Sequence, residues 1–205
     1  AAAEKVVGQP ASVTEGSKQI SSCDLSPDGE WLAVYAGGRQ EDIMLLRTDG
    51  SELRQLTDDV HRDRMPRWSP DGKRIAFYSN RSGKYEVWLI NPDGSGLEQL
   101  TYHPSGTVLY PVWSPDGARL VYSPGGGNPF IMEVAKPWKQ QSLQELPPFS
   151  DAAQWFQPWS WSPDGRKLAG VVQGAAGAGL GVGIYDLETQ KFGRLTDLGA
   201  GPVWL

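Results

Sequence analysis

The tetrapeptide Ser-Pro-Asp-Gly occurs four times in this chain, beginning at Ser26, Ser69, Ser114 and Ser162. The intervals between these serines are 43, 45 and 48 residues, so the chain carries an internal repeat. Self-similarity with a period of this length is typical of solenoids and propellers, in which each unit buries a face only against its neighbours. The repeat therefore constrains the fold far more tightly than the composition does.

The residues around each tetrapeptide predict short antiparallel strands. Proline presets φ in a turn, aspartate accepts local backbone N–H bonds and glycine adopts positive φ, so each Ser-Pro-Asp-Gly is a hairpin turn. Apolar runs follow the glycines at residues 31–34, 75–78, 120–122 and 168–171. Third runs follow at 43–46, 87–90, 130–132 and 182–185. A fourth strand ends in Leu-Thr at 56–57, 100–101 and 195–196.

Four short strands per repeat predict an all-β fold, a β-propeller of four-stranded antiparallel blades. About four blades are expected, at residues 18–57, 63–101, 107–146 and 153–196, with partial flanking strands at 9–14 and 201–205. Tryptophans beside the turns, at Trp68, Trp113, Trp161 and Trp204, should wedge between adjacent sheets. Because a propeller closes to remove its strand edges, we expect residues 1–205 to form a single arc of a larger propeller. The remainder of that propeller or another chain would complete it.

Composition excludes several classes of function. The 205 residues are 39% apolar and 21% charged, as in an ordinary globular chain. The net charge of −5 argues against sequence-independent binding to the phosphate backbone of a nucleic acid. Cys23 is the single cysteine, so no intrachain disulfide forms. No apolar run of about 18 residues is present, so we expect a soluble chain without direct membrane insertion.

The second unit gives a family resemblance. It combines the turn Trp68-Ser69-Pro70-Asp71-Gly72, the hairpin 80–83 and the terminal Leu100-Thr101, in that order. This combination resembles the TolB-type propeller repeat, and the resemblance covers nearly the whole chain. It weakens at Leu25, where tryptophan is usual, at 143–146, where Leu-Thr is lost, and at the long hairpin 173–179. Similar repeats occur in periplasmic TolB, in the propellers of prolyl-oligopeptidase-type and tricorn-type peptidases, and in sensor arms of bacterial kinases and regulators. The resemblance implies a periplasmic or extracytoplasmic location.

Binding residues are expected on one face of the propeller. The connections from the second to the third strand, and from the fourth strand to the next blade, share this face, which we call the first face. Its loops are long and varied, whereas the opposite face, the turn face, carries the uniform Ser-Pro-Asp-Gly turns. Because aromatic and arginine residues anchor interfaces, we predict that a peptide or protein partner binds the first-face candidates around a central depression. These candidates are His61, Arg62, Arg64, Asn80, Arg81, Tyr102, His103, Tyr110, Trp155 and Phe156. Alternatively, Tyr110, Trp155 and Phe156 cap the blade cores.

Catalytic and metal-binding patterns are weak. His61 and His103 could share a metal with Asp59 or Asp63, but their spacing is not repeated, and we predict neither a metal nor a cofactor. The chain has no G-x-S-x-G elbow and no P-loop lysine, and the repeated aspartates are turn-formers. We therefore predict a non-catalytic scaffold that binds a peptide or protein. The alternatives are an accessory substrate-filtering domain of a prolyl-oligopeptidase-type serine peptidase and the sensor arm of a bacterial receptor-like kinase or regulator.

Overall fold

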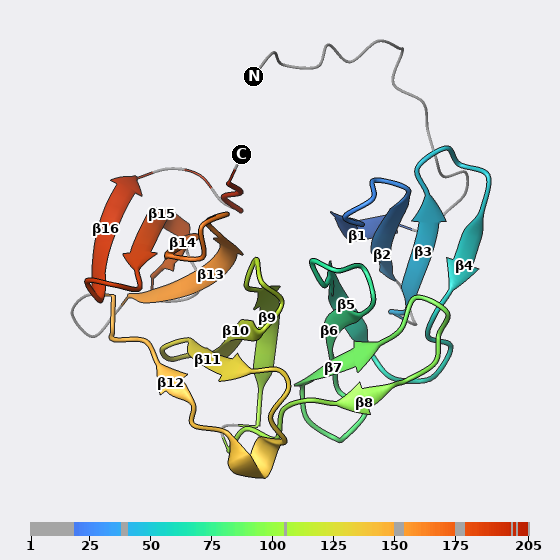
Figure 1. Cartoon of the computed structure of the whole chain (residues 1–205), viewed down its shortest axis with the longest axis horizontal. Helices are drawn as coiled ribbons and strands as arrows, with labels where there is room; N and C mark the ends of the chain where they lie inside the picture. The colour runs from blue at the N-terminus through green and yellow to red at the C-terminus, as the bar shows by residue number, and fades with distance from the viewer. Residues whose placement is uncertain are drawn as a thin grey trace.

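The computed structural model describes residues 19–37, 41–104, 106–149, 154–174, 179–197, 199 and 201–204. Within these ranges the chain forms four separate four-stranded antiparallel sheets, each built from strands that are consecutive in sequence. The sheets stand side by side as the blades of an open arc, with the first strand of each blade innermost and the fourth outermost (Figure 1). The predicted fold class, four-stranded propeller blades, is confirmed.

The strand bounds follow the repeat along the chain. Blade 1 contains β1 (Gln19–Leu25), β2 (Trp31–Gly37), β3 (Ile43–Arg47) and β4 (Leu53–Gln55). Blade 2 contains β5 (Asp63–Trp68), β6 (Ile75–Ser79), β7 (Glu86–Ile90) and β8 (Glu98–Gln99). Blade 3 contains β9 (Val108–Trp113), β10 (Arg119–Pro124), β11 (Phe130–Glu133) and β12 (Gln144–Glu145), with the short 3₁₀ helix η1 (Trp138–Gln140) before its last strand. Blade 4 contains β13 (Trp155–Trp161), β14 (Lys167–Gln173), β15 (Gly179–Asp186) and β16 (Lys191–Thr196).

Each Ser-Pro-Asp-Gly segment joins the first two strands of its blade through the same side-chain contacts. In blade 2 the Ser69 hydroxyl donates to Asp71 at 2.7 Å and accepts the Arg74 backbone N–H at 2.9 Å. Gly72 adopts a φ of +68°, which few other residues tolerate. The Ser69 hydroxyl also lowers the pKa of Asp71, because it hydrogen-bonds the ionised carboxylate. These aspartates are therefore turn-formers, as the sequence predicts.

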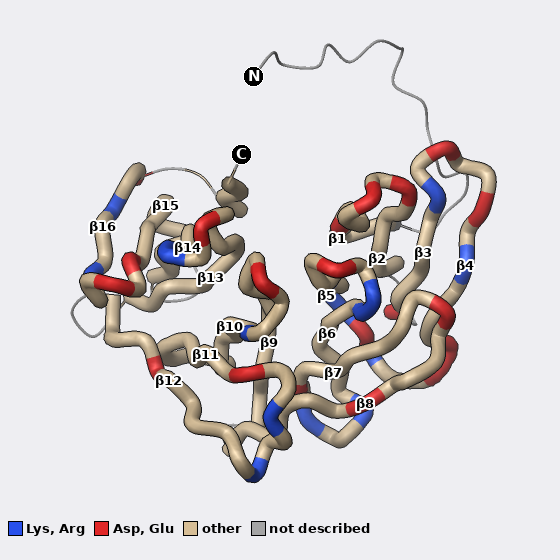
Figure 2. The backbone as a smooth tube through the Cα atoms, in the orientation of Figure 1, with Lys and Arg blue, Asp and Glu red and all other residues tan. Residues whose placement is uncertain are grey.

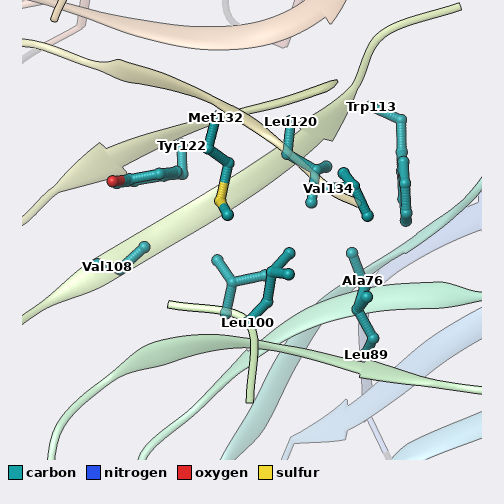
Figure 3. Packing of buried hydrophobic residues seen from close by; sticks show 10 residues of the cluster. Ala76, Leu89, Leu100, Val108, Trp113, Leu120, Tyr122, Met132 and Val134 are labelled. Atoms are coloured by element: carbon teal, nitrogen blue, oxygen red, sulfur yellow. The ribbon is translucent and has the colours of Figure 1, made fainter. Parts of the chain in front are cut away.

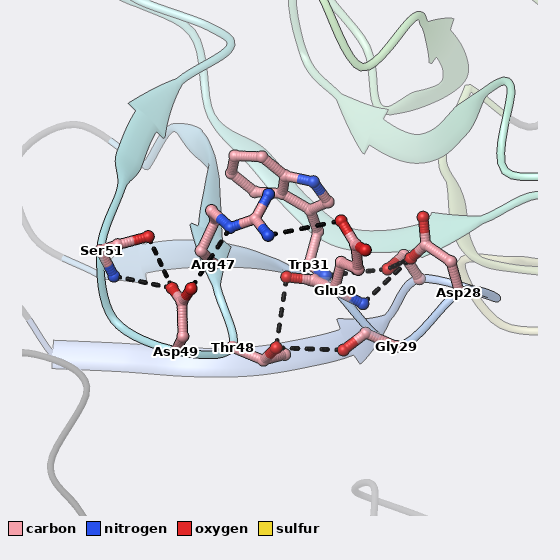
Figure 4. Close-up of polar contacts among 9 residues, drawn as sticks. Asp28, Gly29, Glu30, Trp31, Arg47, Thr48, Asp49 and Ser51 are labelled. Carbon is pink, nitrogen blue, oxygen red and sulfur yellow. Dashed lines mark hydrogen bonds and ion pairs between the residues drawn. The ribbon is translucent and has the colours of Figure 1, made fainter.

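The turns on this face are also tied to one another. Figure 4 shows the blade 1 turn at Asp28 and Gly29 beside the turn at Asp49. Thr48 donates its hydroxyl to the Gly29 carbonyl at 3.1 Å, and Arg47 lies 3.4 Å from Glu30. The two turns of blade 1 are therefore linked by side-chain contacts.

The Leu-Thr pairs end the fourth strand through a buried side-chain contact. The Thr57 hydroxyl accepts the backbone N–H of Ile43 at 2.9 Å, and the Thr101 hydroxyl accepts that of Val87 at 2.8 Å. Both threonines are buried. Each hydroxyl thus satisfies a backbone N–H at the start of the third strand, beyond the end of the short fourth strand.

Three repeated tryptophans fill the space between neighbouring blades, as predicted. Trp68 packs between blades 1 and 2, Trp113 between blades 2 and 3, and Trp161 between blades 3 and 4. Figure 3 shows Trp113 above Ala76 and Leu89 of blade 2 and beside side chains of blade 3. The Trp113 indole N–H also donates to the Arg67 carbonyl of blade 2 at 3.0 Å.

The predicted flanking strands have different outcomes. Residues 9–14 lie outside the described residues. Residues 201–204 form no strand, contrary to the prediction, although the Ser160 hydroxyl donates to the Pro202 carbonyl at 2.8 Å. Trp204 is only half-buried.

Among the residues that the structure describes, no helix has the length and apolar character needed to cross a bilayer.

Candidate functional site

The two sets of first-face connections meet between neighbouring blades. Glu41, before the third strand of blade 1, forms a parallel bridge with Arg62, just before blade 2. Tyr85 forms the equivalent bridge with Thr107 between blades 2 and 3. The loops of the first face are thus held together by backbone contacts.

Arg81 belongs to a buried ionic network of the first face. Its guanidinium donates to Asp63 at 2.5 Å, lies 3.3 Å from Asp59 and stacks 5.1 Å from the centre of the Trp88 ring. The Asp63 side chain is fully buried and that of Arg81 is 8% exposed. Because this guanidinium is enclosed by its carboxylates, it fastens the loop and offers no surface to a partner, which corrects its assignment as a binding residue.

His61, Arg62 and Asn80 lie together beside that network. The Arg62 backbone N–H donates to the Asn80 side-chain oxygen at 2.8 Å, and the His61 N–H donates to Asp59 at 2.8 Å. Arg62 is exposed and the other two residues are half-buried. Asn80 therefore shapes the loop, while the Arg62 side chain faces solvent.

Arg64 lies on the inner strand β5 and links two blades. It forms a bidentate ion pair with Glu41, and its guanidinium carbon is 5.7 Å from the centre of the Tyr85 ring. The Arg64 hydrogen bonds lower the pKa of Glu41 and raise that of Arg64, because each stabilises the charged form of the other. The Arg64 side chain remains 28% exposed.

Tyr110 occupies a strained position on the inner strand β9. Its φ is +55°, it precedes Pro111, and the pairing of β9 with β10 shifts register there. A non-glycine residue in this region costs on the order of 1 kcal/mol or more. The bulge leaves the half-buried Tyr110 ring 5.8 Å from Tyr78 and 6.0 Å from Trp159. Tyr110 thereby connects blades 2, 3 and 4 across the inner strands.

Trp155 and Phe156 begin the inner strand β13 and point to different environments. Phe156 is 1% exposed and packs 5.1 Å from the ring of Phe192 in blade 4. Its prediction as a surface binding residue is wrong, and the alternative prediction of core packing is right. Trp155, the first residue of β13, is half-buried and its side chain lies on the opposite side of the sheet from that of Phe156.

Tyr102 and His103 lie on the outer rim between blades 2 and 3, so their predicted place around the central depression is wrong. The His103 ring is 4.9 Å from Phe130 and 6.3 Å from Trp138, and Tyr102 is 55% exposed. Both residues follow Thr101 directly, at the end of the outermost strand. The connection from the outermost strand of blade 2 to the innermost strand of blade 3 is still on the outer side of the arc at these residues.

The central depression contains a cavity of about 510 Å³. All four inner strands line it, together with Pro70, Pro115 and Pro163 of the Ser-Pro-Asp-Gly turns, so it opens toward the turn face. Sequence reasoning placed the candidate surface on the first face and missed this cavity. A signal was available, because Cys23 and Trp159 stand where the other two blades carry proline, and both line the cavity.

The cavity wall carries an ion pair and a stacked aromatic side chain. Asp24 accepts the Trp68 backbone N–H at 2.8 Å and lies 3.3 Å from the Arg67 guanidinium. Burial raises the pKa of Asp24, and Arg67 opposes that effect in part. The Arg67 guanidinium carbon is 5.6 Å from the centre of the Trp159 ring. The cavity wall thus exposes the Arg67 guanidinium and the Trp159 indole, and the Asp24 carboxylate holds the guanidinium in place.

In the described ranges, no group of three or more His, Cys, Asp and Glu side chains is arranged to hold a metal ion. His61 lies beside Asp59, whereas His103 is on the outer rim among aromatic rings.

Comparison with known proteins places these observations in a family. The family model described as the TolB beta propeller domain, PD40, matches residues 6–168. An uncharacterized protein of Agrobacterium fabrum, Atu1656, is 31% identical over 56% of this chain and 43% of its own length. Dipeptidyl-peptidase 5 of Porphyromonas endodontalis is 32% identical over 51% of this chain and 16% of its own length. The matched regions therefore span less than half of these curated relatives.

Among solved structures, TolB from Acinetobacter baumannii superposes with a TM-score of 0.76 at 22% identity, over 94% of this chain and 47% of that chain. This likeness shows the fold, in which the present arc corresponds to part of a larger protein. Because this family model matches residues 6–168, most of the sequence, and the described residues form propeller blades, the chain belongs to the TolB β-propeller family.

Proposed function

We propose that this propeller segment is a scaffold that binds a peptide or protein partner in its central depression. One observation carries the proposal. Trp159 and Arg67 line a cavity of about 510 Å³. The centre of the Trp159 ring is 5.6 Å from the Arg67 guanidinium carbon and 6.0 Å from the centre of the Tyr110 ring. Tryptophan, tyrosine and arginine are the residues most enriched at binding hot spots, and here three of them converge from three blades.

The inner wall is also preorganised. Asp24 and Arg67 both line the cavity and form an ion pair, so the Arg67 guanidinium does not need to be ordered when a partner arrives. Figure 2 shows acidic and basic positions interspersed through the four blades, without a broad basic side. This distribution favours a protein or peptide over a nucleic-acid backbone as the partner.

A second candidate function follows from the match to dipeptidyl-peptidase 5. In a peptidase, a propeller of this kind would admit peptides to a catalytic domain located elsewhere in the protein. Such a channel would bind peptides weakly and without sequence preference, whereas a scaffold for one partner would select related sequences. The same experiment therefore separates the two functions.

The test is to pan a phage-displayed library of random peptides against the immobilised chain, and then to measure the recovered peptides individually by fluorescence polarisation. We expect recovered sequences to converge and their affinity to fall about tenfold or more in Trp159→Ala, as for a hot-spot residue. Leu53→Ala, at an exposed position of the outer strand β4, is the matched control and should bind as the unsubstituted chain does.

Cys23 supplies a readout that does not depend on a variant. It is the single cysteine, it is exposed, and it lines the cavity. A bound peptide should slow its reaction with a maleimide. Diverse weak binders that still protect Cys23 would favour the peptidase function, and tight binding that leaves the Cys23 reaction rate unchanged would refute a central site.

A further inference from the structure

The inner strand of blade 1, β1, has an edge that is not paired with another described strand, and we call it the free edge. Within the described ranges, β1 is the first strand of its sheet and pairs with β2 alone. The Ser26 backbone N–H donates to the Trp31 carbonyl at 2.8 Å, and hydrogen-bonded residues alternate along an antiparallel pair. In this register Asp24 is bonded to β2, whereas the backbone groups of Cys23 and Leu25 point away from β2. The free edge therefore presents two N–H and two carbonyl groups.

The free edge of β1 faces the central cavity. Blade 2 shows the direction of these groups, because Trp68 is the repeat equivalent of Leu25 and its N–H donates to the Asp24 carboxylate at 2.8 Å. The N–H at this repeat position thus points away from the second strand of the blade and toward the neighbouring inner strand. Residues 22–25 of β1 line the cavity of about 510 Å³. A chain that enters the cavity therefore meets the unpaired backbone of β1.

Proline blocks the corresponding position in two other blades. Cys23 is the third residue before its motif serine, and Pro66 and Pro111 occupy this position in β5 and β9. Because proline has no N–H, it prevents another strand from pairing with an edge. β13 carries Pro158 one residue earlier, within its register shift. β1 contains no proline, so its free edge keeps the donor that Pro66 and Pro111 remove.

The free edge is also accessible. Cys23 is exposed, and Leu25 is 54% exposed at the position where the other three blades carry a buried tryptophan. Among the described residues, the N–H and carbonyl groups of Cys23 and Leu25 have no hydrogen-bond partner. Donors and acceptors two residues apart along one edge match the main chain of another extended strand, which carries the same groups at the same interval. This pattern identifies the ligand by its backbone.

We propose that an extended, proline-free peptide segment binds in the central cavity by adding as a strand to the free edge of β1, through backbone hydrogen bonds to Cys23 and Leu25. This inference rests on the proposed function and specifies how the partner is held. Strand addition at a sheet edge takes affinity from the main chain and specificity from alternate side chains. Because one face of the blade 1 sheet packs against blade 2, alternate side chains of the added strand lie on the side of Arg67 and Trp159.

The variant Cys23→Pro tests recognition of the backbone. The probe is a fluorescein-labelled peptide of alternating threonine and valine with a lysine at each end, titrated by fluorescence polarisation into the 205-residue chain. We expect saturable binding that is about tenfold or more weaker in Cys23→Pro than in Cys23→Ala, because both lack the thiol and only proline lacks the N–H. Melting temperatures check that both variants fold, as the prolines at this position in β5 and β9 lead us to expect.

Two measurements on the unsubstituted chain do not depend on how Cys23→Pro folds. Methylating the backbone nitrogens of the central residues of the probe removes its donors on both edges, so a shift of register cannot restore them, and binding should be lost. In an isotope-labelled chain followed by NMR, the probe should slow hydrogen exchange of the Cys23 and Leu25 amides about tenfold or more. Asp24 is the internal control, because its N–H is already bonded to β2 and should change less.

Several outcomes would overturn strand addition: no saturable binding of the probe, equal affinity in Cys23→Pro and Cys23→Ala, full binding of the methylated probe, or unchanged exchange at Cys23 and Leu25. Failure of the proposed function gives a different result. Peptides recovered by panning that bind Cys23→Pro normally but lose affinity in Trp159→Ala would keep the central site and refute the added strand. Peptides that ignore Trp159→Ala and leave Cys23 unprotected would refute the central site itself.

Discussion

Gly170 occupies a position at which neighbouring atoms leave no room for a side chain. A Cβ atom there would lie 2.3 Å from the Gln157 carbonyl oxygen and 2.6 Å from the Phe156 ring. The glycine on β14 is therefore what allows Phe156 to turn inward and fill the core of blade 4. Gly193, on β16 of the same blade, has no atom within 4 Å of its Cβ position.

These two glycines give a matched pair of substitutions. We expect Gly170→Ala to lower the free energy of unfolding by about 1–3 kcal/mol, because the added methyl overpacks a closed core. Gly193→Ala should leave it within about 0.5 kcal/mol, since the site is open and exposed. Urea denaturation followed by circular dichroism measures both values. Equal effects would show that backbone entropy, and not the contact with Phe156, decides the role of Gly170.

His103 provides a pH-dependent prediction. Burial lowers its pKa, and the nearby Glu145 carboxylate opposes this effect only in part. Above the unfolded pKa of about 6.5 the imidazole is neutral in both states. Below it the unfolded chain takes up a proton that the folded chain resists, so the free energy of unfolding falls as the pH falls.

The comparison is between the unsubstituted chain and His103→Phe, which keeps an aromatic ring against Phe130 and Trp138. The difference in melting temperature between the two chains should shift in favour of the variant on going from about pH 8 to about pH 5. Effects of other titrating groups cancel in this difference. A difference that stays constant across the pH range would contradict a neutral buried His103.

At the scale of elements, the threonines at the fourth strands of blades 1, 2 and 4 differ in burial. Thr101 is fully buried, and its hydroxyl both accepts the Val87 N–H and donates to Glu86. Burial raises the pKa of that glutamate. Thr196 makes a longer contact of 3.3 Å with the Val182 N–H and is exposed.

We therefore expect Thr101→Val to lower the free energy of unfolding by about 1–3 kcal/mol, because it leaves a buried N–H and a buried carboxyl without their partner. Thr196→Val, the control, should cost less than about 0.5 kcal/mol, since water can replace its hydroxyl. Urea denaturation of the two variants distinguishes them. A Thr196→Val effect as large as that of Thr101→Val would mean that burial is not the cause.

The elements also show what could be predicted from the sequence. Turn and strand positions follow from local chemistry repeated four times, so the blades were predictable. The position of a loop residue depends on where it lies along its connection. Tyr102 comes three residues after Gln99, the last residue of the outermost strand β8, and therefore still lies on the outer rim. The direction of Phe156 depends on space provided by Gly170 across the sheet. The Asp24–Arg67 pair joins residues 43 positions apart, which is the interval between Ser26 and Ser69, so the two occupy the same repeat position in adjacent blades. The repeat places them on neighbouring inner strands but does not give the contact between their side chains.

For the whole molecule, the arc places its blades in unequal environments. Blades 2 and 3 are packed on both faces through the clusters around Trp68, Trp113 and Trp161, whereas blades 1 and 4 have one described neighbour each. All five residues of β6 are buried, while β16 is exposed at five of its six residues. In a repeat array, stability is the sum of the units and of the interfaces between nearest neighbours.

Hydrogen exchange should therefore be slowest in β6 and β10 and fastest in β16, because local opening is cheapest where burial is least. Truncating the central interface with Trp113→Ala should accelerate exchange in β6 and β10 together, since each of these strands contributes side chains to the Trp113 cluster. Trp31→Ala, which removes an indole stacked beneath Arg47 and Arg54 on blade 1, should accelerate exchange mainly in blade 1. If Trp113→Ala affected only blade 3, the blades would be energetically independent. Faster exchange in both blade 2 and blade 3 would instead mean that the blades stabilise one another. The positions of Arg67 and Trp159 on the central wall would then depend on the packing of all the blades.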